Sequence, residues 1–140
     1  MTHLHELVGK HMLTAAARTD VRHPFDSDAN GIMWFMDNKI YAVFEDPDDG
    51  YRSHAGPIFV ATGDASSVGG IEAEYIQREV IARMAPKAED DWYESEVLEL
   101  IDVQNGHTWL RVGTRDVNDY YPSFVAEWHP MQSVDPRAED

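Results

Sequence analysis

The sequence predicts an α+β fold that is mainly antiparallel β-sheet, with a short N-terminal helix and at most one further helix. Three observations predict this class. Short apolar runs of strand-like composition recur along the chain, turn-forming residues separate them, and only brief segments have helical spacing. With 140 residues, 43% of them hydrophobic, the chain can bury one core. We therefore expect one acidic β-rich domain over residues 1–132 and a polar tail over residues 133–140.

The N-terminal segment has the pattern of a short helix over residues 3–9. Thr2 is a suitable N-cap, because its side chain can accept a hydrogen bond from the first turn. Leu4 and Leu7 fall on one side of such a helix, and Gly9 is suited to end it. The sequence therefore predicts about two helical turns here.

Three strand-like runs follow. Residues 12–21 are modestly apolar and end shortly before a proline, which favours a strand. Residues 32–36 and residues 40–44 are rich in β-branched and aromatic side chains, and Asp37-Asn38 between them suits a tight turn. The last two runs therefore predict a β-hairpin.

A second hairpin has the strongest pattern in the chain. Residues 97–103 and residues 108–113 are apolar strand-like runs that flank Asn105-Gly106. Asparagine and glycine tolerate the positive φ angles of a type I′ turn, so we predict that turn type here.

Three other segments complete the predicted elements. Residues 57–61 and residues 121–128 are expected to be strands. Residues 71–85 fit either a helix or a strand, since Val80 and Met84 are compatible with both periodicities.

The composition limits the classes of partner. With 11 Lys and Arg against 26 Asp and Glu, the formal net charge is −15, so the mean field repels a phosphate backbone and argues against direct nucleic-acid binding. The same field attracts a basic protein surface. Alternatively, the acidity serves only solubility or adaptation to a salty setting.

The expected compartment is the cytoplasm. The chain has no cysteine, which excludes disulfides and thiolate chemistry and fits a reducing environment. Its N-terminus lacks the basic and apolar regions of a signal peptide, and no apolar run is long enough to cross a membrane.

Two patterns suggest metal sites, and each has a simpler reading. Asp26, Asp28, Asn30 and Gly31 match the first half of a calcium loop, but position twelve is Asp37 instead of the usual glutamate. A polar turn that enters a hairpin explains the same residues. The seven histidines are scattered, which favours ordinary surface or hydrogen-bonded histidine over zinc ligation.

No catalytic motif is recognisable. The chain has no Gly-x-Ser-x-Gly turn, no cysteine–histidine pair and no phosphate-binding loop. An enzyme remains unsupported, and no cofactor is expected.

Two loops mix arginine and tyrosine with carboxylates and are the predicted binding site. They cover residues 45–54 and residues 113–123, and both follow strand-like segments, so they can meet at one end of the sheet. An internal network, with Arg52 or Arg115 braced by aspartates, is the structural alternative. The candidate partner- or ligand-binding residues are Asp46, Asp48, Asp49, Tyr51, Arg52, Arg115, Asn118, Asp119 and Tyr120.

A resemblance adds a biological setting. The strings from Glu45 to Ser53 and from Gly113 to Phe124, with Leu7-Val-Gly-Lys10, are similar to those of a group of small uncharacterised proteins carried by bacteriophages and prophages. The resemblance implies an accessory protein in a bacterial cytoplasm, and small acidic proteins in that setting often inhibit host defence, some by imitating nucleic acid.

Two hypotheses of function result. The first is a non-enzymatic inhibitor that binds a basic surface of a host protein through an acidic face. The second is a small-ligand (nucleotide-like) or metal-ion binder, or an unrecognised enzyme, with its site in the two loops. The sequence does not indicate the oligomeric state.

Overall fold

A single antiparallel sheet of eight strands dominates the computed structural model, which describes residues 3–22, 30–46, 54–56, 58–62, 75–86, 96–115 and 123–130. Within these ranges there is one 3-10 turn and no α-helix. The elements are η1 (Leu4–Leu7), β1 (Gly9–Arg22), β2 (Asn30–Met36), β3 (Lys39–Phe44), β4 (Phe59–Thr62), β5 (Tyr75–Met84), β6 (Glu96–Asp102), β7 (Thr108–Arg115) and β8 (Ser123–Trp128).

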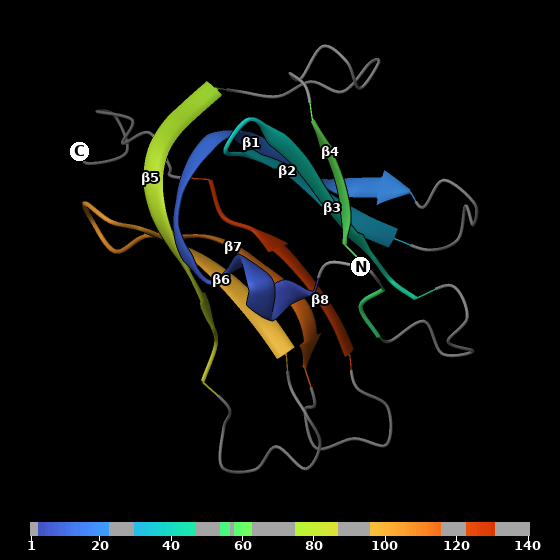
Figure 1. The fold of residues 1–140 in the computed structure, drawn as a ribbon. Coiled ribbons are helices and arrows are strands. Elements are labelled where there is room, and N and C mark those ends of the chain that lie inside the picture. The colour runs from blue at the N-terminus through green and yellow to red at the C-terminus, as the bar shows by residue number, and fades with distance from the viewer. Residues whose placement is uncertain are drawn as a thin grey trace, which may run out of the picture.

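The strand order places the first strand in the middle of the sheet. The order is β4-β3-β2-β1-β5-β6-β7-β8, and every neighbouring pair is antiparallel. The pairing of β1 with β2 shifts register at three places between Leu13 and Val21. Such bulges bend a strand and increase its twist. The sheet therefore curves strongly (Figure 1), and β8 approaches β1 and β2 although it does not pair with them.

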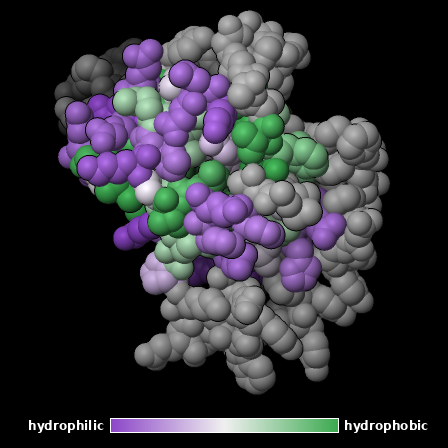
Figure 2. Space-filling view, viewed as in Figure 1, coloured by the Kyte–Doolittle hydropathy of each residue, from purple (hydrophilic) through white to green (hydrophobic). Residues whose placement is uncertain are grey.

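The concave side of this curved sheet holds the main hydrophobic core. Leu4 and Leu7 of η1 are buried in it, and Trp34 stacks on Tyr41 with ring centroids 5.5 Å apart. On the outer surface, hydrophilic residues predominate on the face that Figure 2 shows, with smaller groups of hydrophobic residues between them. Among the described residues, the largest fully buried apolar side chains are Leu13, Ile32, Trp34, Met36, Val43, Val80, Leu98, Leu100, Leu110 and Val112.

The structure confirms the β-rich prediction and the first hairpin. Met36 pairs with Lys39, and Asp37 and Asn38 between them have φ of 54° and 63°, the left-handed pair that a type I′ turn requires. Within the ambiguous segment, residues 71–85, residues 75–84 form strand β5, and residues 71–74 lie outside the described residues. The strands expected over residues 12–21, 57–61 and 121–128 overlap β1, β4 and β8, and residues 57, 121 and 122 lie outside the described residues.

The N-terminal helix prediction was wrong. Residues 4–7 form only a single 3-10 turn, in which the side chain of Glu6 accepts a hydrogen bond from the backbone N–H of His3 at 2.5 Å. Val8 is already extended, and Gly9, with φ of 133°, begins β1. A helix of two turns is marginally stable by itself. From Gly9 onward, the backbone instead forms the strand hydrogen bonds of β1. Thr2, the predicted cap, lies outside the described residues.

The second hairpin is confirmed, but its predicted turn type was wrong. Gly106 has φ of 77°, whereas Asn105 does not have a positive φ, so the pair is not a type I′ turn. The connection is longer: the backbone N–H of Gly106 donates to the carbonyl of Asp102 at 2.9 Å, and that of Asp102 donates to the carbonyl of His107 at 2.7 Å. The Asp102 side chain organises this wider turn, as described below.

Candidate functional site

The structure describes only two of the predicted binding residues, Asp46 and Arg115. Asp46 follows β3 and is partly buried, and its backbone N–H donates to the carbonyl of His54 at 2.7 Å. Arg115 is exposed at the end of β7, where it pairs with Ser123 of β8. The remaining candidates lie outside the described residues: Asp48, Asp49, Tyr51, Arg52, Asn118, Asp119 and Tyr120.

The described ends of the two predicted loops meet. The backbone N–H of Ala55 donates to the hydroxyl oxygen of Thr114 at 2.6 Å, and Thr114 is buried. Ala55 is itself held to β3, because it forms a β-bridge with Glu45. The structure therefore brings Ala55, just after the first predicted loop, into contact with Thr114 at the start of the second.

A third connection leaves the sheet at the same edge. Glu96, the first residue of β6, pairs with Thr114, and the backbone N–H of Ala85 donates to the carbonyl of Val97 at 2.7 Å. In Figure 1, the end of β5, the start of β6, the end of β7 and the start of β8 lie together at the lower side. We call Ala55, Ala85, Glu96, Thr114 and Ser123 the Thr114 edge. Residues 47–53, 87–95 and 116–122 are connected to the sheet through it.

The structure describes only part of the candidate calcium loop. Asp26 and Asp28 lie outside the described residues. Asn30 is the first residue of β2, and its carbonyl accepts a hydrogen bond from the backbone N–H of Glu45 at 2.8 Å. Gly31 has no positive φ, and a Cβ there would lie 2.1 Å from the ring of Phe44. The lack of a side chain at Gly31 therefore allows the Phe44 ring to pack closely against it. This packing accounts for the glycine without a calcium loop.

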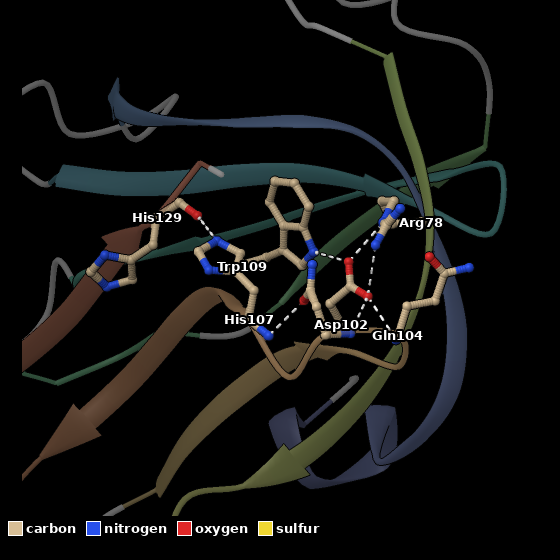
Figure 3. A network of polar contacts seen from close by, with 7 residues as sticks. Arg78, Asp102, Gln104, His107, Trp109 and His129 are labelled. Carbon is tan, nitrogen blue, oxygen red and sulfur yellow. Dashed lines mark hydrogen bonds and ion pairs between the residues drawn. The ribbon is translucent and has the colours of Figure 1, made fainter. Parts of the chain in front are cut away.

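The sequence reasoning missed a buried polar network around Asp102 (Figure 3). The Asp102 side chain is fully buried, and Arg78 reaches it through Nε at 2.7 Å and Nη2 at 3.1 Å. The indole N–H of Trp109 donates to the same carboxylate at 3.2 Å, and the backbone N–H of Gln104 donates at 2.8 Å. A carboxylate inside a core is tolerated only when it is paired in this way.

The electrostatics of this network follow from these contacts. Burial by itself raises the pKa of Asp102, but hydrogen bonds from Arg78, Gln104 and Trp109 outweigh it and lower that pKa to about 2. The hydrogen bond to Asp102 also raises the pKa of Arg78. Both groups are therefore charged at neutral pH, so neither is poised to exchange a proton with a substrate. The network braces the turn after β6 against β5.

A signal for this network is present in the sequence. Asp102 continues the alternation of Leu98 and Leu100 and so belongs on the buried face of its strand, while Arg78 does the same before Val80. Two opposite charges at buried positions of neighbouring strands predict a pair. An irregularity in the pairing of β6 with β7 places Trp109 in the core beside Asp102 and Arg78. No local sequence pattern predicts this irregularity.

The convex face carries a second set of ion pairs. Arg83 Nε lies 3.1 Å from one oxygen of Glu99, and Arg111 Nε lies 3.0 Å from the other, although the Arg111 N–H does not point at it. Glu127 lies 4.0 Å from Arg111 Nη1. These charges stand opposite one another on β5, β6, β7 and β8, so they neutralise one another across the sheet.

Among the described residues, His11 and Asp37 make a histidine–carboxylate contact of the kind seen in catalytic dyads. His11 Nδ1 contacts one oxygen of Asp37, whose other oxygen accepts a hydrogen bond from the backbone N–H of Met12 at 2.8 Å. However, His11 Nε2 lies 2.6 Å from the carbonyl oxygen of Leu7. Both ring nitrogens therefore hold η1 and the first hairpin turn together, and neither faces a substrate.

Among the described residues, no group of three or more histidine, aspartate or glutamate side chains is arranged to hold a metal ion. No helix there combines the length and hydrophobicity needed to traverse a bilayer.

Comparison of the chain with protein-family models, with curated proteins and with solved structures gives no match.

Proposed function

We propose that this chain is a non-enzymatic binding protein that captures a basic surface of another protein and blocks it. The observation that carries the proposal is that the described residues flanking three acidic segments lie together at the Thr114 edge. The acidic segments are residues 47–53, 87–95 and 116–122. Their carboxylates are Asp48, Asp49, Glu89, Asp90, Asp91, Glu94, Asp116 and Asp119.

The ion pairs on the sheet support the proposal that unpaired acidic charge is concentrated near the Thr114 edge. Arg78, Arg83 and Arg111 are each held beside a carboxylate of the sheet, so they do not offset the acidic connections. The net charge of −15 must therefore come from other positions. Carboxylates gathered at one edge produce a stronger local field than the same number spread over a surface.

This field defines the partner. It repels nucleic acid and attracts lysine- and arginine-rich surfaces, which are the surfaces that nucleic-acid-binding proteins present. The resemblance to phage-borne proteins supports the setting: a bacterial host protein, inhibited by occupation of its nucleic-acid-binding face.

The test uses charge reversal at matched positions. The tagged protein is used to capture partners from bacterial cytoplasm at low and at high salt, and association rates are then measured with the captured proteins. The variants are Asp48→Lys with Asp49→Lys, and Asp90→Lys with Asp91→Lys. The control is Glu72→Lys with Glu74→Lys, which changes the net charge equally beside Tyr75, at the end of β5 remote from Met84.

Both edge variants should bind at least tenfold more slowly than the control, because each weakens the same local field. The wild-type rate should fall as salt is raised above about 0.1 M, where the field is screened within about 10 Å. Capture that is insensitive to salt, or equal among all three variants, would refute the proposal.

The small-ligand alternative has one observation in its favour. The hydrogen bond between Ala55 and Thr114 joins the two loops that contain Arg52 and Arg115, so a ligand could contact both. Calorimetry with nucleotides distinguishes the two proposals. Saturable binding that Arg115→Ala abolishes would favour the ligand site, whereas the acidic-edge proposal predicts no such heat.

A further inference from the structure

The convex face of β1 and β5 exposes apolar side chains side by side. Met12 and Ile81 retain 42% and 41% of their accessible surface, although both lie in the centre of the sheet. Val103 follows with 43%, and its backbone N–H donates to the carbonyl of Glu79 at 3.0 Å, which places it beside β5. Exposed apolar residues that adjoin one another commonly mark an interaction surface.

The strand register fixes how these residues are arranged. Lys10 pairs with Ile81, and Met12 pairs with Glu79. These four exposed side chains therefore form a parallelogram with Met12 and Ile81 on one diagonal and Lys10 and Glu79 on the other. We call them the β1–β5 patch.

We infer that the β1–β5 patch binds a second copy of this chain around a two-fold axis. A two-fold axis along the diagonal from Met12 to Ile81 lays each of these side chains over its own counterpart. The same rotation brings the ends of the other diagonal close to each other, so Lys10 faces Glu79 of the second copy and Glu79 faces its Lys10. The patch is thus complementary to itself in both hydrophobicity and charge, as an isologous interface requires.

Two further residues fit the same axis. Val103 lies beside Glu79, and Val8, with 52% of its surface exposed, lies two residues before Lys10. The rotation carries each valine toward the other valine of the second copy. All of the exposed apolar residues on this part of the face then contact an apolar neighbour.

The charge of the β1–β5 patch favours a second copy of this chain over a basic partner protein. The patch holds one lysine and one glutamate, and Arg83 lies next to it on β5, so this face lacks the acidic excess of the whole chain. Two copies nevertheless repel each other through their net charge of −15. The dimer should therefore be weak at low salt and tighter at high salt, the opposite of the salt dependence of the proposed function.

Sedimentation velocity over a range of concentrations tests the inference. Wild-type protein should dimerise, and the dissociation constant should fall at least threefold when salt rises from about 0.05 M to about 0.5 M. Ile81→Lys should raise the dissociation constant more than tenfold. Val60→Lys is the matched control, because Val60 has the same 42% exposure as Met12 but lies in β4, and it should leave the dissociation constant unchanged.

A charge exchange tests the orientation. Lys10→Glu should weaken the dimer, because two glutamates then face each other, and Lys10→Glu combined with Glu79→Lys should restore it. Denaturation midpoints show that each variant is folded. A wild-type protein that stays monomeric up to roughly 1 mM, or a double exchange that does not restore a dimer lost in Lys10→Glu, would overturn the inference.

Discussion

The hydroxyl oxygen of Thr114 accepts a hydrogen bond at 2.6 Å from the backbone N–H of Ala55, which lies 59 residues earlier in the chain. This contact joins the two halves of the curved sheet at the Thr114 edge. Thr114→Val keeps the side-chain shape but leaves the N–H without its acceptor. We expect a loss of about 1–2 kcal/mol in the free energy of unfolding, measured by urea denaturation.

Thr14→Val is the comparison for this change. The Thr14 hydroxyl donates to the carbonyl of Phe35 at 3.0 Å, so its removal leaves only an acceptor that retains a second lone pair. This variant should lose less stability than Thr114→Val. The amide of Ala55 should exchange hydrogen faster in Thr114→Val but not in Thr14→Val, which would show that the loss of stability comes from this hydrogen bond. Unchanged exchange at Ala55 in Thr114→Val would contradict this assignment.

Stability should fall in acid because of Asp102. Its pKa is lowered from 3.8 to about 2 in the folded protein, so the folded state favours the carboxylate. The stabilisation, about 2 kcal/mol, is present above the unfolded pKa near 4 and is lost as pH falls through 2. Asp102→Asn should remove this dependence: between pH 5 and pH 2, wild type should lose about 2 kcal/mol more than the variant. Parallel pH profiles of the two proteins would contradict this assignment.

Gly113→Ala should destabilise far more than Gly9→Ala. Both glycines have positive φ, 147° and 133°, so the conformational cost is similar. However, a Cβ at residue 113 would lie 1.9 Å from the carbonyl oxygen of Glu96, whereas one at residue 9 meets no atom within 4 Å. We expect a difference of at least about 2 kcal/mol in unfolding free energy. Equal losses would show that β6 and β7 are not so closely apposed.

Gly106→Val tests the second turn. Its φ of 77° is strained for a β-branched residue, and the space around it is open, so the cost is purely conformational. We expect a loss of about 1–2 kcal/mol, and a smaller loss for Gly106→Asn, because asparagine tolerates this region. A denaturation midpoint that does not change in Gly106→Val would be inconsistent with the positive φ.

Calcium should not bind tightly to the segment from Asp26 to Gly31. The position of Gly31 is explained by its contact with Phe44, and Asp37 is engaged with His11 and Met12. Calorimetry at micromolar calcium should therefore show no binding. Sub-micromolar binding that Asp28→Ala abolishes would refute this.

Local patterns predicted the strands well, because each depends on neighbours in the chain. Asp37-Asn38 determines its turn through its own φ preferences. The turn at Asn105-Gly106 was mispredicted because the Asp102 carboxylate, buried against Arg78, binds the backbone at Gln104 and widens the connection. Arg78 is 24 residues away, so the decisive partner is invisible to a local pattern.

The candidate site was predictable only in part. The meeting of the loops at Thr114 depends on the curvature of the sheet, which arises from bulges in β1 that no residue type marks. Sequence composition could identify the acidic segments but could not show that the strand ends flanking them lie together. The Lys10 to Glu79 diagonal likewise depends on register between strands some seventy positions apart.

The central position of β1 also bears on how the chain acquires its structure. β1 to β4 pair with sequential neighbours, and so do β5 to β8, so each half of the sheet can assemble from local contacts. Among the strand pairings, only that of β1 with β5, which sets Lys10 against Ile81, connects the two halves. Closing so long a loop is entropically costly, and topologies rich in distant contacts fold slowly. We therefore expect this alignment to limit the refolding rate, and during synthesis β1 to β4 can nucleate before β5 to β8 emerge from the ribosome.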